Sequence, residues 1–523
     1  MAKLPSDLLF QLIKSLSKSE KRYLKLSLGA VSTPPLKSML LFEALDRQEV
    51  LDEADVLRQA PDLEARQLSN LKAHLYEKIL QGLRAFHTTH SPDIQTREAI
   101  SHAQLLLDRG LYKHCSKLLR KAKKMAQQND NLELWLEVLK LEKRVFAQGI
   151  GGENQEAVNL IIQQVQDVNT RINNINVLTN IQVRLNHWYV KTGFVRKAQY
   201  QQEIKEYIQR NLPSFKESTL SFQEKVSLYD VYVTYYLFIQ DFTQAYTYAH
   251  RWASLYEQRP ERVARAPLTY VRSLHKLLIT QNKLHYYPDY LATTEKLQAT
   301  PSSPGIVMNE NLRAMLFKYV TIHQINGHFL TGDFTGGVSL VRTIEHDLDP
   351  WVDKLGRHAT IIFYYKIACM YFGASQHRPA AYWLQRIINE QQGDLREDIH
   401  CFARILNLIS HYELGNTDVI DYYIKSTYRF LLMKDDLGMY QQYILTFLKN
   451  LDRETTEADL MVRFEQLRAQ LLTLTRRPYE SRAFTYFDII SWLESKIRRC
   501  TVEEVIREKA QRQIAAEASP LHR

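Results

Sequence analysis

Hydrophobic residues recur at steps of three and four along most of the chain, which is the spacing of one face of an α-helix. In the first ninety residues this pattern predicts a helix through Leu16 capped by Ser6 or Asp7, a second over residues 17 to 28, a third through residues 41 to 45, and a longer one over residues 63 to 86. Pro34 and Pro35 separate the second helix from the third. These helices form a compact N-terminal segment.

A turn signal recurs at intervals of about 40 to 50 residues through the middle of the chain. Each signal starts with Gly or a polar residue and has a small or apolar residue five positions later. Glycine can adopt the positive φ that ends a helix, and a small side chain lets two helices cross closely. We therefore expect Ala198 and Ala245 at close helix crossings. The clearest signals start at Gly110, Gly193, Gln240 and Gly332, and the weaker ones at Gly152, Asn282, Ser375 and Gly415.

Repeated helical hairpins predict an all-α fold, specifically a right-handed α-solenoid. The hairpins occupy residues 98–436, between a helical cap over residues 1–97 and a second cap over residues 437–523. In the second cap we expect helices near residues 440–450, 456–475, 484–498 and 501–516.

Composition agrees with this fold and narrows the class of protein. The chain has only 17 Gly and 15 Pro in 523 residues, which argues against an all-β or disordered chain. The net charge of +10 permits an acidic partner without requiring one. Four widely separated cysteines, a broken apolar pattern over residues 1–16 and the lack of a long apolar run together predict a cytoplasmic protein with reduced thiols and no membrane span.

One hairpin carries a recognisable ladder, formed by Gly110, Tyr112, Cys115, Leu119 and Ala122. This ladder resembles the tetratricopeptide repeat, and the resemblance extends in weaker form over about two-thirds of the chain. It implies that the first helix of each hairpin lines a concave binding surface. The segments over residues 12–23 and 486–496 look like those of uncharacterised bacterial helical-repeat proteins, which implies shared architecture and no known activity.

The sequence contains no recognisable catalytic motif. The phosphate-binding, dinucleotide-binding, zinc-protease and serine-hydrolase motifs are absent, so we expect no enzyme and no cofactor. The glycine-rich run over residues 331–337 lies between two predicted helices and is interpreted as a repeat turn. Four histidines lack metal-ligand spacing and are interpreted as structural or surface residues: His285, His323, His328 and His346.

The first candidate binding site is a basic helix face made by Lys113, Lys117, Arg120 and Lys124, which step by three and four. Such a face could hold phosphates or an acidic peptide, or it could be a solvated helix exterior. No aromatic residue is interleaved with these cations, which weakens the case for nucleic acid.

The second candidate is the polar face of Asn180, Arg184, His187 and Lys191, on the predicted first helix of one hairpin. The resemblance places this helix inward, where these side chains could clamp a peptide; the alternative is an ordinary polar face. A third candidate, the aromatic run of residues 229, 232, 235, 236 and 238, fits a stacking surface or, more simply, core packing.

Two functions fit these observations. The first is a non-enzymatic scaffold that binds a protein or peptide, possibly acidic, along its concave face. The alternative is a nucleic-acid-associated or regulatory protein that uses the basic helix face. Salt separates them, because binding dominated by phosphate contacts weakens steeply as salt rises.

Overall fold

The computed structural model describes residues 6–29, 37–88, 91–148, 154–195, 197–390, 395–434, 437–450, 456–477, 480–485 and 487–517. Within these ranges the chain is all-helical and contains no strand, as the sequence predicted. The chain divides into two compact units, residues 1–173 and 174–523. The division falls inside one long helix, whereas the sequence placed its boundaries near residues 97 and 436.

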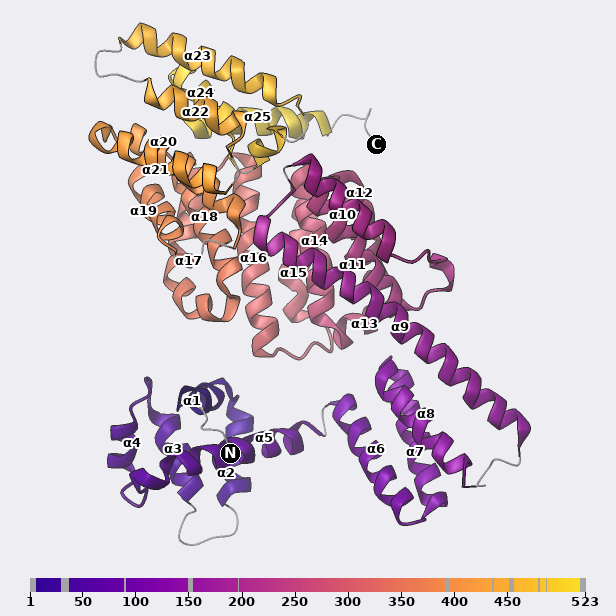
Figure 1. The fold of residues 1–523 in the computed structure, drawn as a ribbon. Coiled ribbons are helices and arrows are strands. Elements are labelled where there is room, and N and C mark those ends of the chain that lie inside the picture. Colours follow the sequence, from indigo (N-terminus) through magenta and orange to yellow (C-terminus); the bar gives the residue numbers. More distant parts are fainter. Residues whose placement is uncertain are drawn as a thin grey trace. The chain divides into compact units, whose positions relative to one another are not determined.

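Among its described residues, the first unit contains eight complete helices and the start of a ninth, which Figure 1 labels in chain order. Three hydrophobic clusters lie in this unit, the smallest formed by Leu139, Ile161 and Val168. The two larger ones form most of the core. One is built by α1 to α5 around Ile13, Leu41 and Leu75, and the other by α6 to α8 around Cys115 and Leu119. The helices are α1 (Ser6–Ser15), α2 (Lys18–Gly29), α3 (Lys37–Arg47), α4 (Glu53–Gln59), α5 (Ala65–Thr88), α6 (Pro92–Asp108), α7 (Tyr112–Gln128), α8 (Leu132–Phe146) and α9 (Gln155–Thr192).

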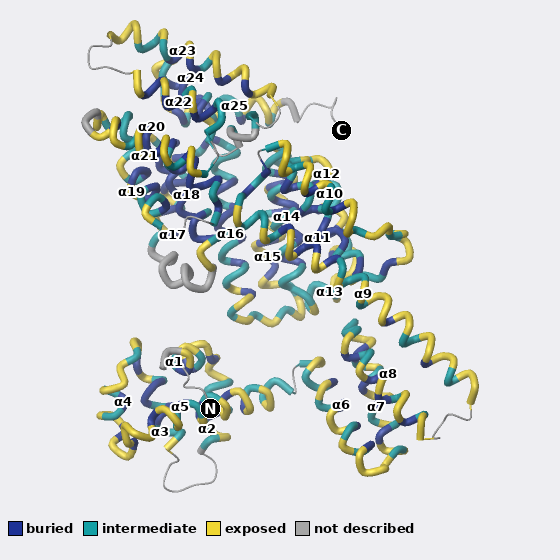
Figure 2. The backbone as a smooth tube through the Cα atoms, in the orientation of Figure 1, coloured by how far each residue is buried: buried dark blue, intermediate teal, exposed yellow. Residues whose placement is uncertain are grey.

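In the second unit successive helices pack as neighbouring pairs, and the first helices of adjacent pairs also touch, in the order α11, α14, α16, α18 and α20. Buried residues are numerous along these helices (Figure 2). The helices are α10 (Ala198–Asn211), α11 (Phe222–Ile239), α12 (Phe242–Glu257), α13 (Pro260–Arg265), α14 (Pro267–Leu284), α15 (Tyr287–Ala299), α16 (Glu310–Thr331), α17 (Phe334–Leu355), α18 (Arg357–Gly373), α19 (His377–Ile388), α20 (Glu397–Glu413), α21 (Thr417–Met433), α22 (Met439–Lys449), α23 (Glu457–Leu474), α24 (Ile489–Arg498) and α25 (Val502–Glu517).

The turns between paired helices repeat one backbone design. At the end of α16, Gly332 has φ +68° and the next amide, that of Asp333, donates a hydrogen bond to the carbonyl oxygen of His328 at 3.0 Å. This pattern satisfies the last carbonyl groups of a helix and requires a left-handed residue. The same positive φ occurs at predicted turn residues Gly110, Gly193, Gln240, Ser375 and Gly415.

Two other predicted turn positions do not show this positive φ: one lies inside a helix and one lies outside the described residues. Asn282 lies inside α14, and the left-handed residue is His285, with φ 60°, because the helix continues to Leu284. Gly152 lies outside the described residues. The glycine-rich run over residues 331–337 contains the turn between α16 and α17, as predicted, with Gly332 and Asp333 between the two helices.

Small residues near the start of second helices allow close packing at several hairpins. Ala245 and Ala380 are fully buried, and a Cβ atom added to Gly337 would lie 2.3 Å from the sulfur of Met370. The prediction for Ala198 is wrong, since this residue is exposed at the first position of α10.

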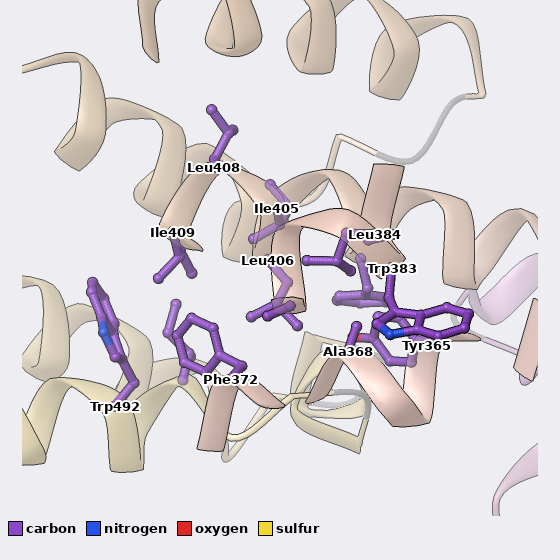
Figure 3. Close-up of a cluster of buried hydrophobic side chains, with 14 of the residues drawn as sticks. Tyr365, Ala368, Phe372, Trp383, Leu384, Ile405, Leu406, Leu408, Ile409 and Trp492 are labelled. Atoms are coloured by element: carbon purple, nitrogen blue, oxygen red, sulfur yellow. The ribbon is translucent and has the colours of Figure 1, made fainter. Parts of the chain in front are cut away.

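A large hydrophobic cluster joins α18, α19 and α20 to the C-terminal helices (Figure 3). Phe372, Leu384 and Ile409 are fully buried in it, and Trp492 of α24 belongs to the same cluster. The indole N–H of Trp492 donates to the carboxylate of Glu413 at 2.6 Å, so the polar atom of this buried ring is satisfied.

Candidate functional site

A stripe of cationic side chains crosses three adjoining first helices of the second unit. We define the cationic face as Arg272, Lys276 and Lys283 of α14, Lys318 of α16 and Lys366 of α18. Positions 272, 276 and 283 lie on one line along α14, because steps of four and seven return to the same side of a helix. All five side chains are partly exposed. Solvent, and hence a ligand, can therefore reach them.

One carboxylate, that of Asp230, supports one end of the cationic face. The guanidinium of Arg272 donates to Asp230 at 2.8 Å, and the amide of Gln182 on α9 donates to the same carboxylate at 3.2 Å. Thr234 accepts hydrogen bonds from Gln182 at 2.9 Å and from the ammonium group of Lys276 at 3.3 Å. This end is a connected polar network in which each cation has a defined neighbour.

Two histidine rings lie beside the middle of the cationic face. His275 and His323 share a hydrogen bond of 2.8 Å, and the His275 ring stacks on Tyr319 with 3.7 Å between ring centres. The hydroxyl of Tyr290 donates to the carbonyl oxygen of His323 at 2.7 Å. Burial lowers the pKa of His323 to about 3 and also lowers the pKa of His275 well below its ordinary value. Both rings are therefore neutral at pH 7 and add no positive charge.

The far end of the cationic face holds Lys283 and Lys366. The ammonium of Lys366 donates to the side-chain oxygen of Asn326 at 2.5 Å and lies 5.6 Å from the ring centre of Phe329. The ammonium of Lys283 lies 5.9 Å from the ring centre of Phe194. Aromatic faces attract cations, so the two rings help to hold these ammonium groups in place.

Burial weakens the basicity of the lysines of the cationic face. It lowers the pKa of Lys276 to about 8, although the charge of Asp230 opposes the shift. It lowers the pKa of Lys283 to about 7, and the positive charges of Lys366 and Arg396 lower this pKa further. The pKa of Lys366 falls to about 8 by burial and by the charge of Arg396, against the opposing effect of Cys369. Strongly shifted pKa values of this kind gather at functional sites.

A buried ion pair between Arg396 and Asp398 lies next to Lys283. Arg396 donates two hydrogen bonds to Asp398, at 2.9 and 2.6 Å, and its backbone amide donates to the carbonyl oxygen of Val190 at the end of α9. Both side chains are almost fully buried. The Asp398 carboxylate lies against Gly193, where a Cβ atom would be 1.8 Å from its Oδ2. Asp398 therefore pairs with Arg396, which itself belongs to the turn before α20.

The predicted polar face of α9 is an exposed side of that helix. Asn180, Arg184, His187 and Lys191 are all exposed on one side of α9, opposite the buried Leu178 and Leu185. A different residue of the same helix, Gln182, donates a hydrogen bond to Asp230. The four predicted residues thus share a face, but they are not brought together with the cationic face.

The basic helix face lies in the first unit, on α7. Lys113, Lys117, Arg120 and Lys124 are all exposed, as is the neighbouring Lys121. Their neighbour Lys123 is instead held by Glu142 at 2.7 Å. Among the described residues none of the five exposed cations forms an ion pair, so this face keeps its full charge.

The aromatic run of α11 packs against α12. Tyr232 and Tyr236 stack on Tyr248, with ring centres 4.4 and 5.8 Å apart, and Tyr229 and Phe238 are buried. The run is therefore mainly a packing element, as the simpler interpretation held.

Comparison of the sequence with protein-family models, with curated proteins and with solved structures finds no match. None of the helices among the described residues has both the length and the apolar composition needed to cross a bilayer. In the same part of the chain no group of three or more His, Cys, Asp or Glu side chains is arranged to hold a metal ion.

Proposed function

We propose that this protein is a non-enzymatic scaffold of the helical-repeat, tetratricopeptide-like α-solenoid type, which binds an acidic segment of a partner protein along the cationic face. One observation carries the proposal: partly exposed cations of three successive, touching first helices interact with one another, Lys276 with Arg272 and Lys318, and Lys283 with Lys366. A cation in a partly desolvated position attracts a carboxylate more strongly than a fully hydrated cation does. Acidic side chains of an extended segment could pair with successive cations of this surface.

Energetics favours a binding role over a purely structural one. Ammonium groups with pKa values lowered by burial destabilise the folded chain, because burial penalises their charged form. A protein keeps such groups where function needs them and loses stability in return. An acidic ligand would restore the missing negative charge.

Binding of a labelled acidic peptide pool tests the proposal, measured by fluorescence anisotropy on the full chain. Replacing Lys276 and Lys318 by Gln should weaken binding by about tenfold, the effect of losing roughly 1.4 kcal/mol of charge-assisted contact. The matched control replaces Lys117 and Lys124 of α7 by Gln, which changes the net charge equally and should leave the affinity nearly unchanged. Reversing Arg184 and Lys191 to Glu tests the exposed face of α9 in the same assay. Equal loss in the first two variants would show that net charge, and not the cationic face, determines binding.

Nucleic-acid binding is the second candidate, and the exposed cations of α7 are the observation that favours it. Four of them follow one helix face at steps suited to a phosphate backbone. If this function holds, single-stranded nucleic acid should bind with an affinity that falls steeply with salt, and the α7 control variant should lose that binding while the variant in the cationic face keeps it.

A further inference from the structure

Among its described residues the first unit has a surface cavity beside α2, which none of the sites described above includes. Its volume is about 460 Å³. The lining consists of four cations and one apolar residue of α2 together with one carboxylate of α3: Lys18, Lys21, Arg22, Lys25, Leu26 and Asp46. Positive charges therefore outnumber negative charges in this lining by three.

The sequence of α2 places its four cations on one side of the helix. Positions 18, 21, 22 and 25 step by three or four, so their side chains are neighbours on the helix surface. They cover roughly 10 Å along the helix axis, given the rise per residue of an α-helix. Leu24 of the same helix is 1 % exposed and belongs to the hydrophobic cluster of α1 to α5. This buried leucine fixes which side of α2 faces the core, and the cations remain exposed or partly exposed.

Asp46 already balances part of this charge. Its carboxylate pairs with Lys21 at 2.7 Å and with Lys25 at 3.5 Å, and its backbone carbonyl oxygen accepts a hydrogen bond from Lys14 of α1 at 2.8 Å. Glu43 lies 4.0 Å from Lys25. These contacts hold Lys21 and Lys25 in place beside the cavity.

Lys18 and Arg22 are the lining cations that Asp46 does not hold. Both are exposed, and in the part of the chain that the structure describes neither forms an ion pair. The acidic residue of α2, Glu20, accepts a hydrogen bond from the backbone amide of Ser17 and shares another, of 2.7 Å, with His87 of α5. Glu20 is therefore turned toward α5, and the charges of Lys18 and Arg22 are left for an anion from outside.

The lining of the cavity recognises charge and little else. It contains no amide, hydroxyl or aromatic side chain. Peptide grooves use backbone hydrogen bonds or side-chain pockets, and single-strand sites stack bases on aromatic rings. One exposed leucine, Leu26, is too little apolar surface for a helix that inserts into a membrane. The backbone of a nucleic-acid duplex instead presents phosphates whatever its sequence, with one negative charge per about 1.7 Å of its axis.

We propose that the cavity beside α2 binds the phosphate backbone of a nucleic-acid duplex without reading its sequence. Lys18 and Arg22 make the phosphate contacts, and Lys21 and Lys25 add to the positive potential around them. This site lies in the first unit and does not rest on the acidic-segment scaffold, whose cationic face belongs to the second unit. Its residues also differ from the exposed cations of α7, so variants can distinguish the two surfaces.

Binding of a short labelled DNA duplex to the full chain tests the inference, measured by fluorescence anisotropy at several salt concentrations. The affinity of the unmodified protein should fall steeply with salt, and an unlabelled duplex of unrelated sequence should compete equally. In the double variant Lys18→Gln, Arg22→Gln the slope of log affinity against log salt should be shallower by roughly 1.8, because each lost phosphate contact removes about 0.9. The matched control Lys78→Gln, Arg84→Gln removes the same two residue types from exposed positions of α5 and should keep the slope.

Several results would overturn the inference. One is the lack of duplex binding by the unmodified protein, and another is an unchanged slope in the α2 variant. An equal change in the α5 control would show that net charge explains the effect. Binding that is lost in Lys117→Gln, Lys124→Gln and kept in the α2 variant would assign the duplex to α7.

Two further measurements complete the test. If vesicles of phosphatidylcholine and phosphatidylserine bind the unmodified protein but not the α2 variant, while the duplex binds neither, the occupant is an anionic membrane and the duplex is ruled out. Circular dichroism checks that the α2 variant folds, which we expect because substitutions at exposed positions change stability little. The charge-preserving variant Lys18→Arg, Arg22→Lys should bind the duplex as the unmodified protein does, and a loss there would contradict recognition by charge.

Discussion

The backbone amide of Arg396 donates a hydrogen bond to the carbonyl oxygen of Val190 at 2.9 Å and so joins the end of α9 to the start of α20. The two helices are far apart in the sequence. Gly193 and Asp398 complete the contact, because the carboxylate occupies the space that a side chain at position 193 would need. The junction lies next to Lys283, so it fixes one end of the cationic face.

Gly193→Ala should destabilise the second unit strongly. The residue has φ +74°, which penalises a non-glycine residue by roughly 1–2 kcal/mol, and the new methyl group would collide with Asp398. Overpacking should add about 1–3 kcal/mol to the loss. Gly415→Ala is the matched control, because Gly415 has φ +70° with open space around its Cα and should show the backbone penalty alone. Urea unfolding followed by circular dichroism measures both, and equal losses would contradict the junction.

Removing a charge from the cationic face should make the protein more stable. Lys283→Met keeps the length of the side chain and removes an ammonium group that burial and two nearby positive charges disfavour. We expect the melting temperature to rise by about 1–3 °C. Lys117→Met on the exposed face of α7 is the control and should change it little. A clear fall in the Lys283→Met variant would mean that the lysine serves the fold and not a ligand.

Stability should increase with pH between about pH 7 and pH 9. Lys276, Lys283 and Lys366 have pKa values of about 8, 7 and 8 in the folded chain, against an ordinary value of 10.5. In this window the unfolded chain binds more protons than the folded chain, so the free energy of unfolding rises with pH. The charged or titratable groups around these lysines are Asp230, Arg272, His275, Lys318, His323, Cys369 and Arg396 with its partner Asp398.

The contribution of Lys283 to this slope can be measured separately. Lys283→Met should flatten the rise, since the folded and unfolded chains of the variant no longer differ at that position. Thermal melting at several pH values measures the slope. A slope that is unchanged in the variant, or stability that falls between pH 7 and pH 9, would show that the lysines are not desolvated.

Ala245 and Ala198 should respond differently to enlargement. Ala245 is fully buried at the start of α12, so Ala245→Leu should cost about 1–3 kcal/mol by overpacking. Ala198 is exposed on α10, so Ala198→Leu should change stability by less than about 0.5 kcal/mol. Chemical denaturation of the two variants compares them directly, and similar losses would contradict the packing described here.

The turns were predictable from sequence because their chemistry is local. Gly332 and Gly415 end their helices in the left-handed conformation that glycine adopts without penalty. Polar residues do the same at Gln240 and Ser375, and the regular spacing made these visible. The turn at His285 was placed three residues too early, because a helix end depends on where packing stops as well as on the residue type.

The cationic face was not predicted, although part of its signal was present. Arg272, Lys276 and Lys283 follow one line of a helix that is otherwise largely apolar, and that spacing is readable in the sequence. Their meeting with Lys318 and Lys366 depends on how three helices pack, which no local pattern contains. The sequence favours Arg184 and Lys191 because their helical spacing is equally regular. The structure shows that their side of α9 is exposed.

Lysine footprinting tests the central claim most directly, because one experiment compares both basic surfaces. The full chain is acetylated briefly with an amine-reactive ester, with and without the acidic peptide pool, and modification at each lysine is measured by mass spectrometry. The acidic-segment scaffold predicts strong protection of Lys276, Lys318 and Lys366, with Lys113, Lys117 and Lys124 of α7 unchanged. Protection confined to the α7 lysines, or equal protection of both sets, would contradict it.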